Sequence, residues 1–471
     1  MLFPTIEFAL FFAVVFPVAW LLNEYNTLKK CFLVAASYFF YAFFRLDFTL
    51  ILLTSSVTNF CLALWLGHLP DGPARKAALW LGITFNLCVL AAFKYYNFFV
   101  ASTMNAAQLF GWTIDIPFFE VGLPIAISFL TFHALSYIID VYRRKLPPTR
   151  SLVDILLYIS FFPHLVAGPI VRAKAFLEQT VRRSDPSDIR LGFAVVLIAG
   201  GLFKKVIVAN YLSTDFVDGV FRSPTDYSRL DLLIGMYAYA LQIYCDFSAY
   251  TDIAIGIASL LGYRFPDNFN QPYRALSVQD FWRRWHITLS TWLRDYLYIP
   301  LGGSRGGTWL TYRNIMITML LGGLWHGANW NFVIWGALHG VALVVERLLG
   351  VTGEEGGKRR VPAFISWFVT FHFVCLTWVF FRSPSFDGAM AYLDTLLFGE
   401  TIFSTTVTPL VAAMLAIGAL TQIIPNHWFD GLERCYDRAS LAVKIALPFV
   451  VVFLVSIAAP GGVPPFIYFQ F

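Results

Sequence analysis

FWRRWHITLSTWLRD, residues 281–295, and LGGLWHGA, residues 321–328, each place a histidine directly after a tryptophan in membrane-type sequence. The two histidines are His286 and His326. An ionisable side chain held at membrane depth is costly, so it usually marks a functional site. Both histidines are therefore candidates for chemistry inside a membrane protein.

The composition around these stretches is that of a membrane protein. Of the 471 residues, 58% are hydrophobic and 18% are aromatic, whereas only 13% are charged. This lies well outside the range of soluble globular proteins. A membrane helix needs about 20 apolar residues, and the sequence contains roughly a dozen charge-poor stretches that suggest such helices: 8–22, 31–43, 46–66, 77–93, 121–142, 191–203, 230–245, 309–324, 331–345, 362–381, 405–424 and 441–459. The sequence predicts an all-α polytopic membrane protein, with the shorter stretches tilted, re-entrant or buried in protein.

Basic residues predict the orientation of the first segments. The first apolar stretch lacks a basic leader and a small-residue cleavage site, so it is expected to be retained as a helix. Lys29 and Lys30 follow it, and the positive-inside rule then places the amino terminus outside. The apolar segment 152–170 is interrupted by proline and glycine and is flanked by basic loops at 143–145 and 182–183. If both loops are cytoplasmic, this segment is re-entrant.

The rest of the chain excludes several classes of protein. No soluble domain-sized segment interrupts it, so we expect one membrane domain over 1–471, with a linker at 351–360 and a functional tail at 461–471. The net charge of +5 is modest and fits loop orientation signals better than nucleic-acid binding. The six cysteines form no CxxC pair, so we predict neither structural zinc nor a disulfide framework. A transporter remains the alternative class, although no convincing internal repeat supports it.

The segment from Asp280 to Tyr298 is interpreted as one amphipathic helix at the membrane interface. At about 100° per residue, its polar face would carry Asp280, Arg283, Arg284, Thr288, Thr291, Arg294 and Asp295, and its apolar face Trp282, Trp285, Leu289, Leu293 and Tyr296. His286 would project from the apolar side. It either packs through a hydrogen bond or takes part in the chemistry.

His326 is the stronger catalytic candidate. Gly322, Gly323 and Gly327 remove side-chain bulk around it, which leaves room for a substrate or for a closely packed helix. Imidazole is the side chain best suited to take a proton from a hydroxyl near neutral pH, so we predict that His326 is a general base. For the other histidines, packing or exposure is the default interpretation: His68, His133, His164, His339, His372 and His427.

Several motifs in order carry a family resemblance: 138–142 (IIDVY), 162–169 (FPHLVAGP), 244–252 (YCDFSAYTD), 268–273 (NFNQPY), 282–294 and 324–327 (LWHG). With them the chain resembles the membrane-bound O-acyltransferase family, and within it the bacterial branch of alginate O-acetyltransferases and the related teichoic-acid D-alanyl transfer protein. The resemblance implies a ring of helices with re-entrant segments around a central tunnel. It also implies that His326 matches the essential histidine of the family and His286 its second motif histidine.

The same resemblance implies the reaction and its partners. The donor would be cytoplasmic acetyl-CoA, used as a substrate with no permanently bound cofactor. The acetyl group would pass across the bacterial inner membrane to an exported polysaccharide, with alginate as the leading guess, often through an extracytoplasmic transferase. Arg283, Arg284 and Arg294 would then bind the phosphates of the donor, or alternatively lipid headgroups.

The last residues, GGVPPFIYFQF (461–471), end in an aromatic cluster instead of a polar, frayed terminus. We expect this tail to dock in an apolar groove and to present Tyr468, although aromatic anchoring at the membrane interface is the other interpretation. The ending resembles a tail of the bacterial branch in which the tyrosine is proposed to carry the acyl group. A phenol has a pKa of about 10 and needs a base, which His326 could supply.

Overall fold

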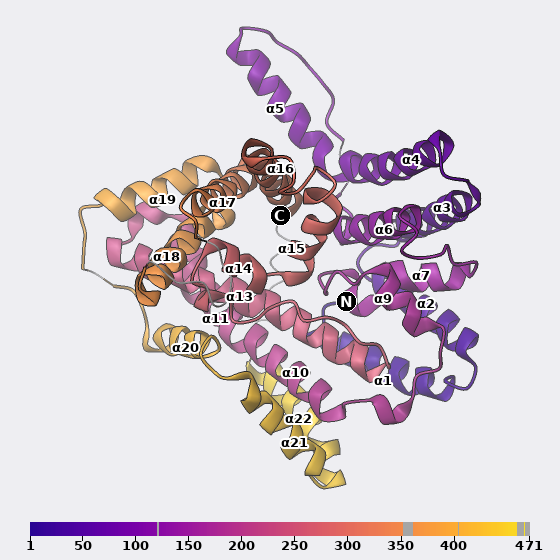
Figure 1. Ribbon diagram of the computed structural model, residues 1–471. Helices are drawn as coiled ribbons and strands as arrows, with labels where there is room; N and C mark the ends of the chain where they lie inside the picture. Colours follow the sequence, from indigo (N-terminus) through magenta and orange to yellow (C-terminus); the bar gives the residue numbers. More distant parts are fainter. Residues whose placement is uncertain (120–121, 352–360, 404, 459–465, 467–471) are drawn as a thin grey trace. The chain divides into compact units, whose positions relative to one another are not determined.

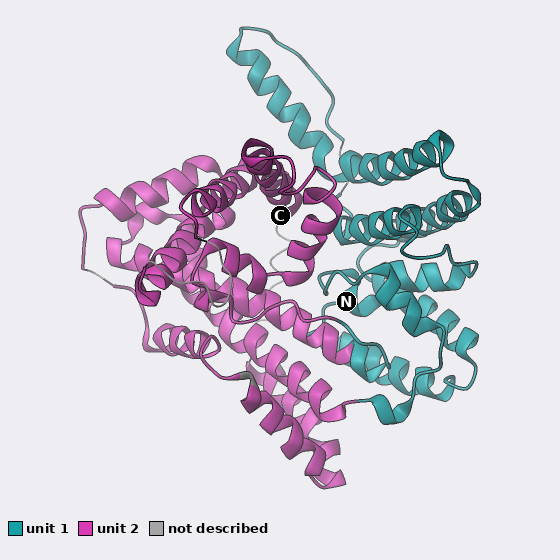
Figure 2. Cartoon of the chain, in the orientation of Figure 1, with its two compact units in different colours: residues 1–189, 258–265 teal, residues 190–257, 266–471 magenta. Residues whose placement is uncertain are grey.

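A computed structural model describes residues 1–119, 122–351, 361–403, 405–458 and 466. In these residues the regular structure is helical throughout, without a strand, which confirms the predicted all-α class (Figure 1). The contacts divide the chain into two compact units, residues 1–189 with 258–265, and residues 190–257 with 266–471 (Figure 2). The prediction of one domain over 1–471 stays a prediction.

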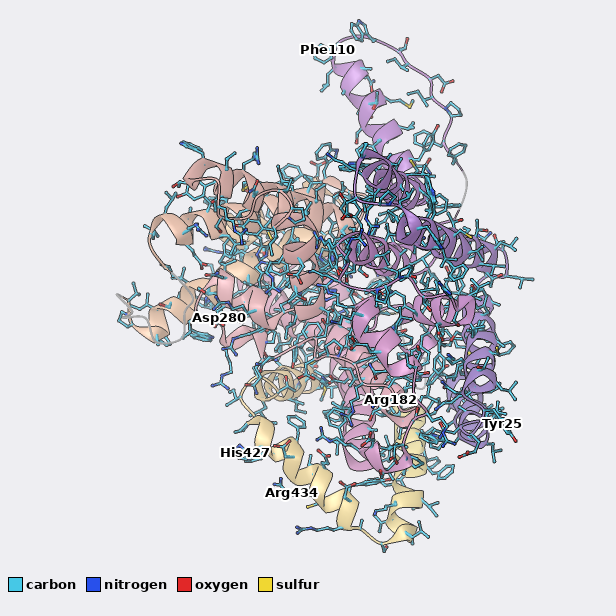
Figure 3. The ribbon with its side chains drawn as sticks, turned by 45° about the vertical axis from the view of Figure 1, so that its right-hand side comes forward. Tyr25, Phe110, Arg182, Asp280, His427 and Arg434 are labelled. Carbon is cyan, nitrogen blue, oxygen red and sulfur yellow. The ribbon has the colours of Figure 1, made fainter. Side chains whose placement is uncertain are left out.

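In its described residues, the first unit contains nine α-helices. They are α1 (Ile6–Leu21), α2 (Asn26–Ala42), α3 (Phe48–His68), α4 (Pro73–Leu90), α5 (Tyr96–Leu109), α6 (Ile127–Tyr142), α7 (Leu152–Ser160), α8 (Phe162–Leu165) and α9 (Ala173–Thr180). A π-helical turn, η1 (Ala91–Tyr95), joins α4 to α5. At the far end of α5 lies Phe110, which is 75% exposed (Figure 3).

The second unit begins with α10 (Leu191–Phe203), which continues through η3 (Lys204–Ala209), α11 (Asn210–Leu212), η4 (Ser213–Val217) and α12 (Asp218–Arg222). Next comes α13 (Arg229–Leu260), whose last residues belong to the first unit. After it lie η6 (Pro272–Arg274), α14 (Val278–Arg284), α15 (Ile287–Leu293), η7 (Arg294–Tyr298), α16 (Thr308–His326), α17 (Trp330–Leu348), α18 (Ala363–Arg382), α19 (Phe386–Phe398), α20 (Pro409–Leu420), α21 (Asn426–Arg438) and α22 (Leu441–Ala458).

Five helical segments of the described chain are long and apolar enough to cross a membrane: Phe48–His68, Pro73–Leu109, Leu191–Arg222, Trp330–Leu348 and Ala363–Arg382. Four shorter apolar helices accompany them: Ile6–Leu21, Ile127–Tyr142, Pro409–Leu420 and Leu441–Val455. The chain is therefore a multi-pass membrane protein. Long spans are fewer than the charge-poor stretches, because many of those stretches fold as short helices.

The two early lysines are not loop charges, contrary to their use as orientation signals. Both lie in α2 and are buried. Lys29 Nζ donates to Asn23 Oδ1 at 3.0 Å and to Ser184 Oγ at 3.0 Å. Lys30 Nζ pairs with Asp154 at 2.5 Å. They are fixed by internal polar partners, so the outward amino terminus stays a prediction.

Glycines bring α16 and α17 into close contact. A Cβ on Gly323 would lie 2.2 Å from the Phe332 carbonyl oxygen, and one on Gly336 would lie 2.3 Å from the Met319 carbonyl oxygen. Such approach is possible only without a side chain, as in other membrane helix pairs with small residues at the interface. This packing sets where α16 ends, and therefore where His326 lies.

Gly323→Ala should destabilise the second unit, because the added methyl group meets backbone that cannot move away. Overpacking of this kind costs about 1–3 kcal/mol, so thermal unfolding in detergent should begin at a lower temperature. Gly200→Ala in α10 is the matched control, since its Cβ would meet no atom within 4 Å. Equal melting temperatures for Gly323→Ala and the wild type would contradict the packing account.

Candidate active site

The chain bends sharply at the first candidate histidine. α14 ends at Arg284, Trp285 is extended, and His286 adopts a left-handed conformation with φ 43° and ψ 54° before α15 begins. The prediction of one helix over 280–298 is therefore wrong. A left-handed non-glycine residue costs of order 1–3 kcal/mol unless its surroundings hold it.

A neighbouring loop holds this bend. The Ile287 N–H donates to the Asn268 carbonyl oxygen at 2.9 Å, and the Asn270 N–H donates to the Arg284 carbonyl oxygen at 2.9 Å. The Asn268 side chain adds three contacts through Oδ1: the Thr288 N–H at 3.1 Å, the Thr288 hydroxyl at 2.8 Å and His286 Nδ1 at 3.2 Å. The bend is thus fixed by polar bonds with residues 14 to 20 positions earlier in the chain.

His286 is fully buried among aromatic rings. Its ring meets the edge of Phe247 at 4.6 Å between centroids, Trp325 at 6.0 Å and Phe269 at 6.5 Å. Burial lowers the pKa of His286 to about 3, because a charged imidazolium would lose its hydration. The ring is therefore neutral at physiological pH.

His326 is the last residue of α16 and is 3% exposed. Its ring packs against Trp325, Trp335 and Phe381, with centroids 5.0, 5.1 and 5.2 Å away. Trp325 thus contacts both histidines, and the structure brings the two predicted residues into one aromatic layer. Residues of α17 occupy the space beside Gly323 and Gly327. These glycines therefore admit a closely packed helix and do not leave room for a substrate.

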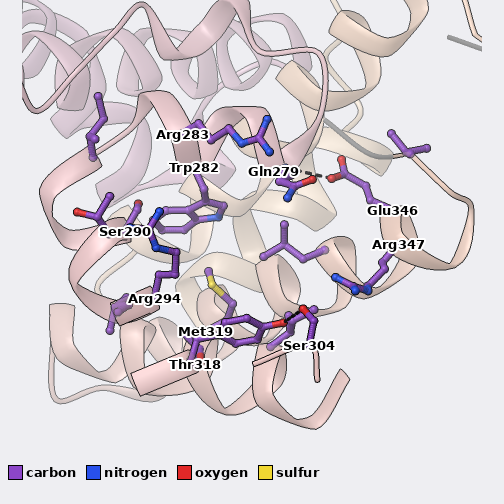
Figure 4. A pocket seen from close by; sticks show the side chains of 17 residues that line it. Gln279, Trp282, Arg283, Ser290, Arg294, Ser304, Thr318, Met319, Glu346 and Arg347 are labelled. Atoms are coloured by element: carbon purple, nitrogen blue, oxygen red, sulfur yellow. Dashed lines mark hydrogen bonds between the residues drawn. The ribbon is translucent and has the colours of Figure 1, made fainter. Parts of the chain in front are cut away.

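A cavity of about 730 Å³ lies beside this layer (Figure 4). Its lining comes from α14, α15, η7, α16, α17 and adjoining loops: Gln279, Trp282, Arg283, Ile287, Ser290, Thr291, Leu293, Arg294, Tyr298, Ser304, Ile315, Thr318, Met319, Leu343, Glu346, Arg347 and Val351. Neither His286 nor His326 is in this lining. Ile287, which does line the cavity, directly follows His286.

Only two of the three predicted arginines line the cavity. Arg283 and Arg294 line it, whereas Arg284 does not and instead pairs with Asp280 at 2.9 Å. Arg347 of α17 is a third arginine in the lining. It could not be predicted from the motif around Arg283 because it lies more than 50 residues further along the chain.

Among the described residues of the lining, the one carboxylate belongs to Glu346. It accepts from the Val278 N–H at 2.5 Å and the Gln279 N–H at 3.0 Å, so it caps the start of α14. The carboxylate thus accepts hydrogen bonds from N–H groups that have no partner within their own helix, at a helix end where negative charge is favourable. The local sequence gives no sign of this role, because the partners of Glu346 lie 67 and 68 positions earlier in the chain.

Two other histidines of this unit are fully satisfied. His339 accepts from Trp282 Nε1 at 3.3 Å and contacts the Thr377 hydroxyl at 3.1 Å. His372 contacts the Tyr237 hydroxyl at 2.7 Å and the Phe368 carbonyl oxygen at 2.8 Å. Their expected packing role agrees with these contacts. In contrast, His286 Nε2 is buried and has no hydrogen-bond partner in the described part of the chain.

The aspartates of the 244–252 motif form two separate ion pairs. Lys204 pairs with Asp252 at 2.6 Å, and Lys205 pairs with Asp246 at 2.8 Å. Asp246 and Asp252 therefore pair with different lysines and not with each other. Because both lysines lie in the π-helical turn η3, these pairs join η3 to α13.

The described part of the tail reaches the same aromatic layer. Phe466 is 2% exposed and packs against Tyr250 at 4.9 Å and Phe247 at 5.6 Å between ring centroids. Phe247 therefore contacts both His286 and Phe466. Tyr468 and residues 352–360 of the predicted linker at 351–360 lie outside the described residues.

Comparisons with known proteins agree with this architecture. The profile of the membrane-bound O-acyltransferase family matches residues 77–381. A probable alginate O-acetylase of Pseudomonas aeruginosa is 41% identical over 416 residues, which cover 87% of this chain and 78% of that protein. A peptidoglycan O-acetyltransferase of Helicobacter pylori is 38% identical over 77% of this chain and 73% of that protein. A teichoic acid D-alanyltransferase of Bacillus subtilis is 28% identical over 56% of this chain and 69% of that protein.

Proposed function

Because this chain belongs to the membrane-bound O-acyltransferase family, and is an O-acyltransferase, we propose that it passes acetyl groups from cytoplasmic acetyl-CoA across the bacterial inner membrane. The final acceptor is an exported polysaccharide, and an extracytoplasmic transferase receives the acetyl group on the way. Relatives named for alginate and for peptidoglycan O-acetylation support a polymer acceptor, with an alginate-like polymer as the leading choice. Family membership argues against the transporter alternative.

The proposed chemistry needs one base and one nucleophile. His326 removes the proton from the Tyr468 hydroxyl, and the phenolate oxygen attacks the thioester carbonyl carbon. The carbon–sulfur bond breaks, and the leaving thiolate takes the proton from His326. The acetyl group then rests on Tyr468 as an ester, from which a hydroxyl of the extracytoplasmic partner removes it.

One observation carries this proposal: a single ring, Phe247, contacts both His286 and the tail residue Phe466. Tyr468 is two residues beyond Phe466, and two residues span at most about 7 Å. Phe466 therefore lies one aromatic ring away from His286. This placement supports the carrier role of Tyr468 over simple anchoring at the membrane interface.

The donor side of the proposal uses the cavity arginines. Arg283, Arg294 and Arg347 supply planar forks of N–H donors, which suit the phosphates of acetyl-CoA. The cavity volume of about 730 Å³ also falls in the usual range for sites of small molecules. Lipid headgroups offer the same phosphate chemistry, so kinetics must separate the two ligands.

His326→Ala should abolish most acetyl transfer while leaving the protein folded, because it removes the general base. Such a loss typically lowers the rate by about 10²–10⁴-fold. The measurement is acetylation of the acceptor by purified protein, corrected for protein amount. His427→Ala on exposed α21 is the control and should keep wild-type activity. Wild-type turnover by His326→Ala would sink the assignment.

Arg283→Ala should raise the apparent KM for acetyl-CoA about tenfold or more, because a hydrogen bond to a charged group contributes about 1.5–3 kcal/mol. Arg284→Ala removes the same charge one residue away but outside the cavity, so its KM should stay near the wild-type value. If the arginines bind lipid, Arg283→Ala would instead leave KM unchanged and alter membrane insertion.

Tyr468→Phe keeps the ring and deletes only the hydroxyl oxygen, so the carrier role predicts loss of polymer acetylation at normal protein levels. Mass spectrometry of the wild-type tail should detect an acetyl group on Tyr468 when acetyl-CoA is present. Normal polymer acetylation by Tyr468→Phe would show that the tail serves only as an anchor.

A further inference from the structure

Asn268 is a buried amide, 1% exposed, whose place beside His286 points to a specific role. Its Oδ1 atom is fixed by the backbone N–H of Thr288, 3.1 Å away. A backbone N–H can only donate, so the Asn268 atom that it meets must be the amide oxygen. In the flipped orientation the Asn268 NH₂ group would face the Thr288 N–H, and two donors cannot form a hydrogen bond, so that orientation is excluded.

The orientation of Asn268 decides the tautomer of His286. His286 Nδ1 lies 3.2 Å from the same amide oxygen, which only accepts, so Nδ1 carries the proton. In a neutral imidazole the other nitrogen then holds a lone pair. His286 Nε2 is thus a buried acceptor without a hydrogen-bond partner among the described residues. Buried polar atoms are usually paired, so a lone pair left open here is available to a ligand.

We propose that Asn268 is a positioning residue for acyl transfer: it holds His286 in the left-handed bend and in the Nδ1–H tautomer. Nε2 then presents its lone pair to a hydrogen-bond donor of the bound substrates. The inference rests on the proposed acetyltransferase function and adds a residue to it. His339, which lies in the same aromatic layer, has partners on both nitrogens and so presents no such acceptor.

The surroundings of His286 make its charge state sensitive to position 268. The rings that touch it, Phe247 of α13, Phe269 and Trp325 of α16, do not ionise. Among the described residues, the ionisable groups nearest to these rings lie one layer further out: Tyr244 packs against Phe269, His326 against Trp325 and Tyr250 against Phe466. Asp246, which precedes Phe247 in the chain, already pairs with Lys205. A carboxylate at 268 would therefore be the nearest charge to the ring.

Asn268→Asp is the discriminating variant, because it keeps an oxygen acceptor for all three donors and adds negative charge. An opposite charge at this range raises a histidine pKa by about 1–3 units. Protonated His286 has no lone pair, so activity requires the neutral ring and is lost as pH falls through its pKa. We expect the acidic limb of the kcat profile to move to higher pH by at least one unit.

Two further variants distinguish a loss of positioning from a loss of folded protein. For each variant, turnover is expressed per folded protein after gel filtration in detergent. Asn268→Ala removes the acceptor and should lower kcat at least tenfold with little change in KM. Thr288→Val removes one donor to Asn268 without touching the histidine, and should keep the wild-type pH profile.

The outcomes distinguish failure of the positioning role of Asn268 from failure of the acetyltransferase function. An Asn268→Asp profile identical to the wild type, or wild-type kcat in folded Asn268→Ala, would overturn the positioning role while leaving the acetyltransferase function intact. A wild-type protein that transfers no acetyl group at any pH would overturn both.

Discussion

The arrangement of the second unit depends on how a buried histidine satisfies its polar atoms without water. In the aromatic layer each ring nitrogen must either find a partner or remain available for a ligand, because burial of an unpaired polar group is costly. His339 and His372 are satisfied on both sides. His286 is satisfied on one side only, and the loop that satisfies it also bends the backbone.

That bend explains why the cavity and His286 are neighbours, since Ile287 lines the cavity. α14 ends where the loop from Asn268 to Asn270 takes its backbone bonds, and α15 starts in a new direction. Glu346 holds the start of α14 against α17, while glycines hold α17 against α16. The helix that ends in His326 and the helices that carry Arg283 and Arg294 are therefore tied into one framework. A site that depends on geometry gains from such rigid supports.

The sequence predicted the class of fold well, because composition and the length of apolar stretches report membrane helices directly. It also singled out His286 and His326, each of which follows a tryptophan, but it could not show that both contact Trp325. It failed where distant residues decide local structure. The helical period across 280–298 could not reveal that Asn268, 18 residues before His286, would break the helix. The burial of Lys29 similarly depends on Ser184, 155 residues away.

The central claim is that acetyl groups cross the membrane by transfer between groups of this protein, not by transport of the donor. Its most direct test places purified protein in sealed vesicles with acetyl-labelled CoA on the cytoplasmic side only. The account predicts that label becomes covalently attached to an acceptor on the opposite side while CoA stays where it was added. Label that crosses only as intact acetyl-CoA, or an acceptor that gains no label, would contradict it.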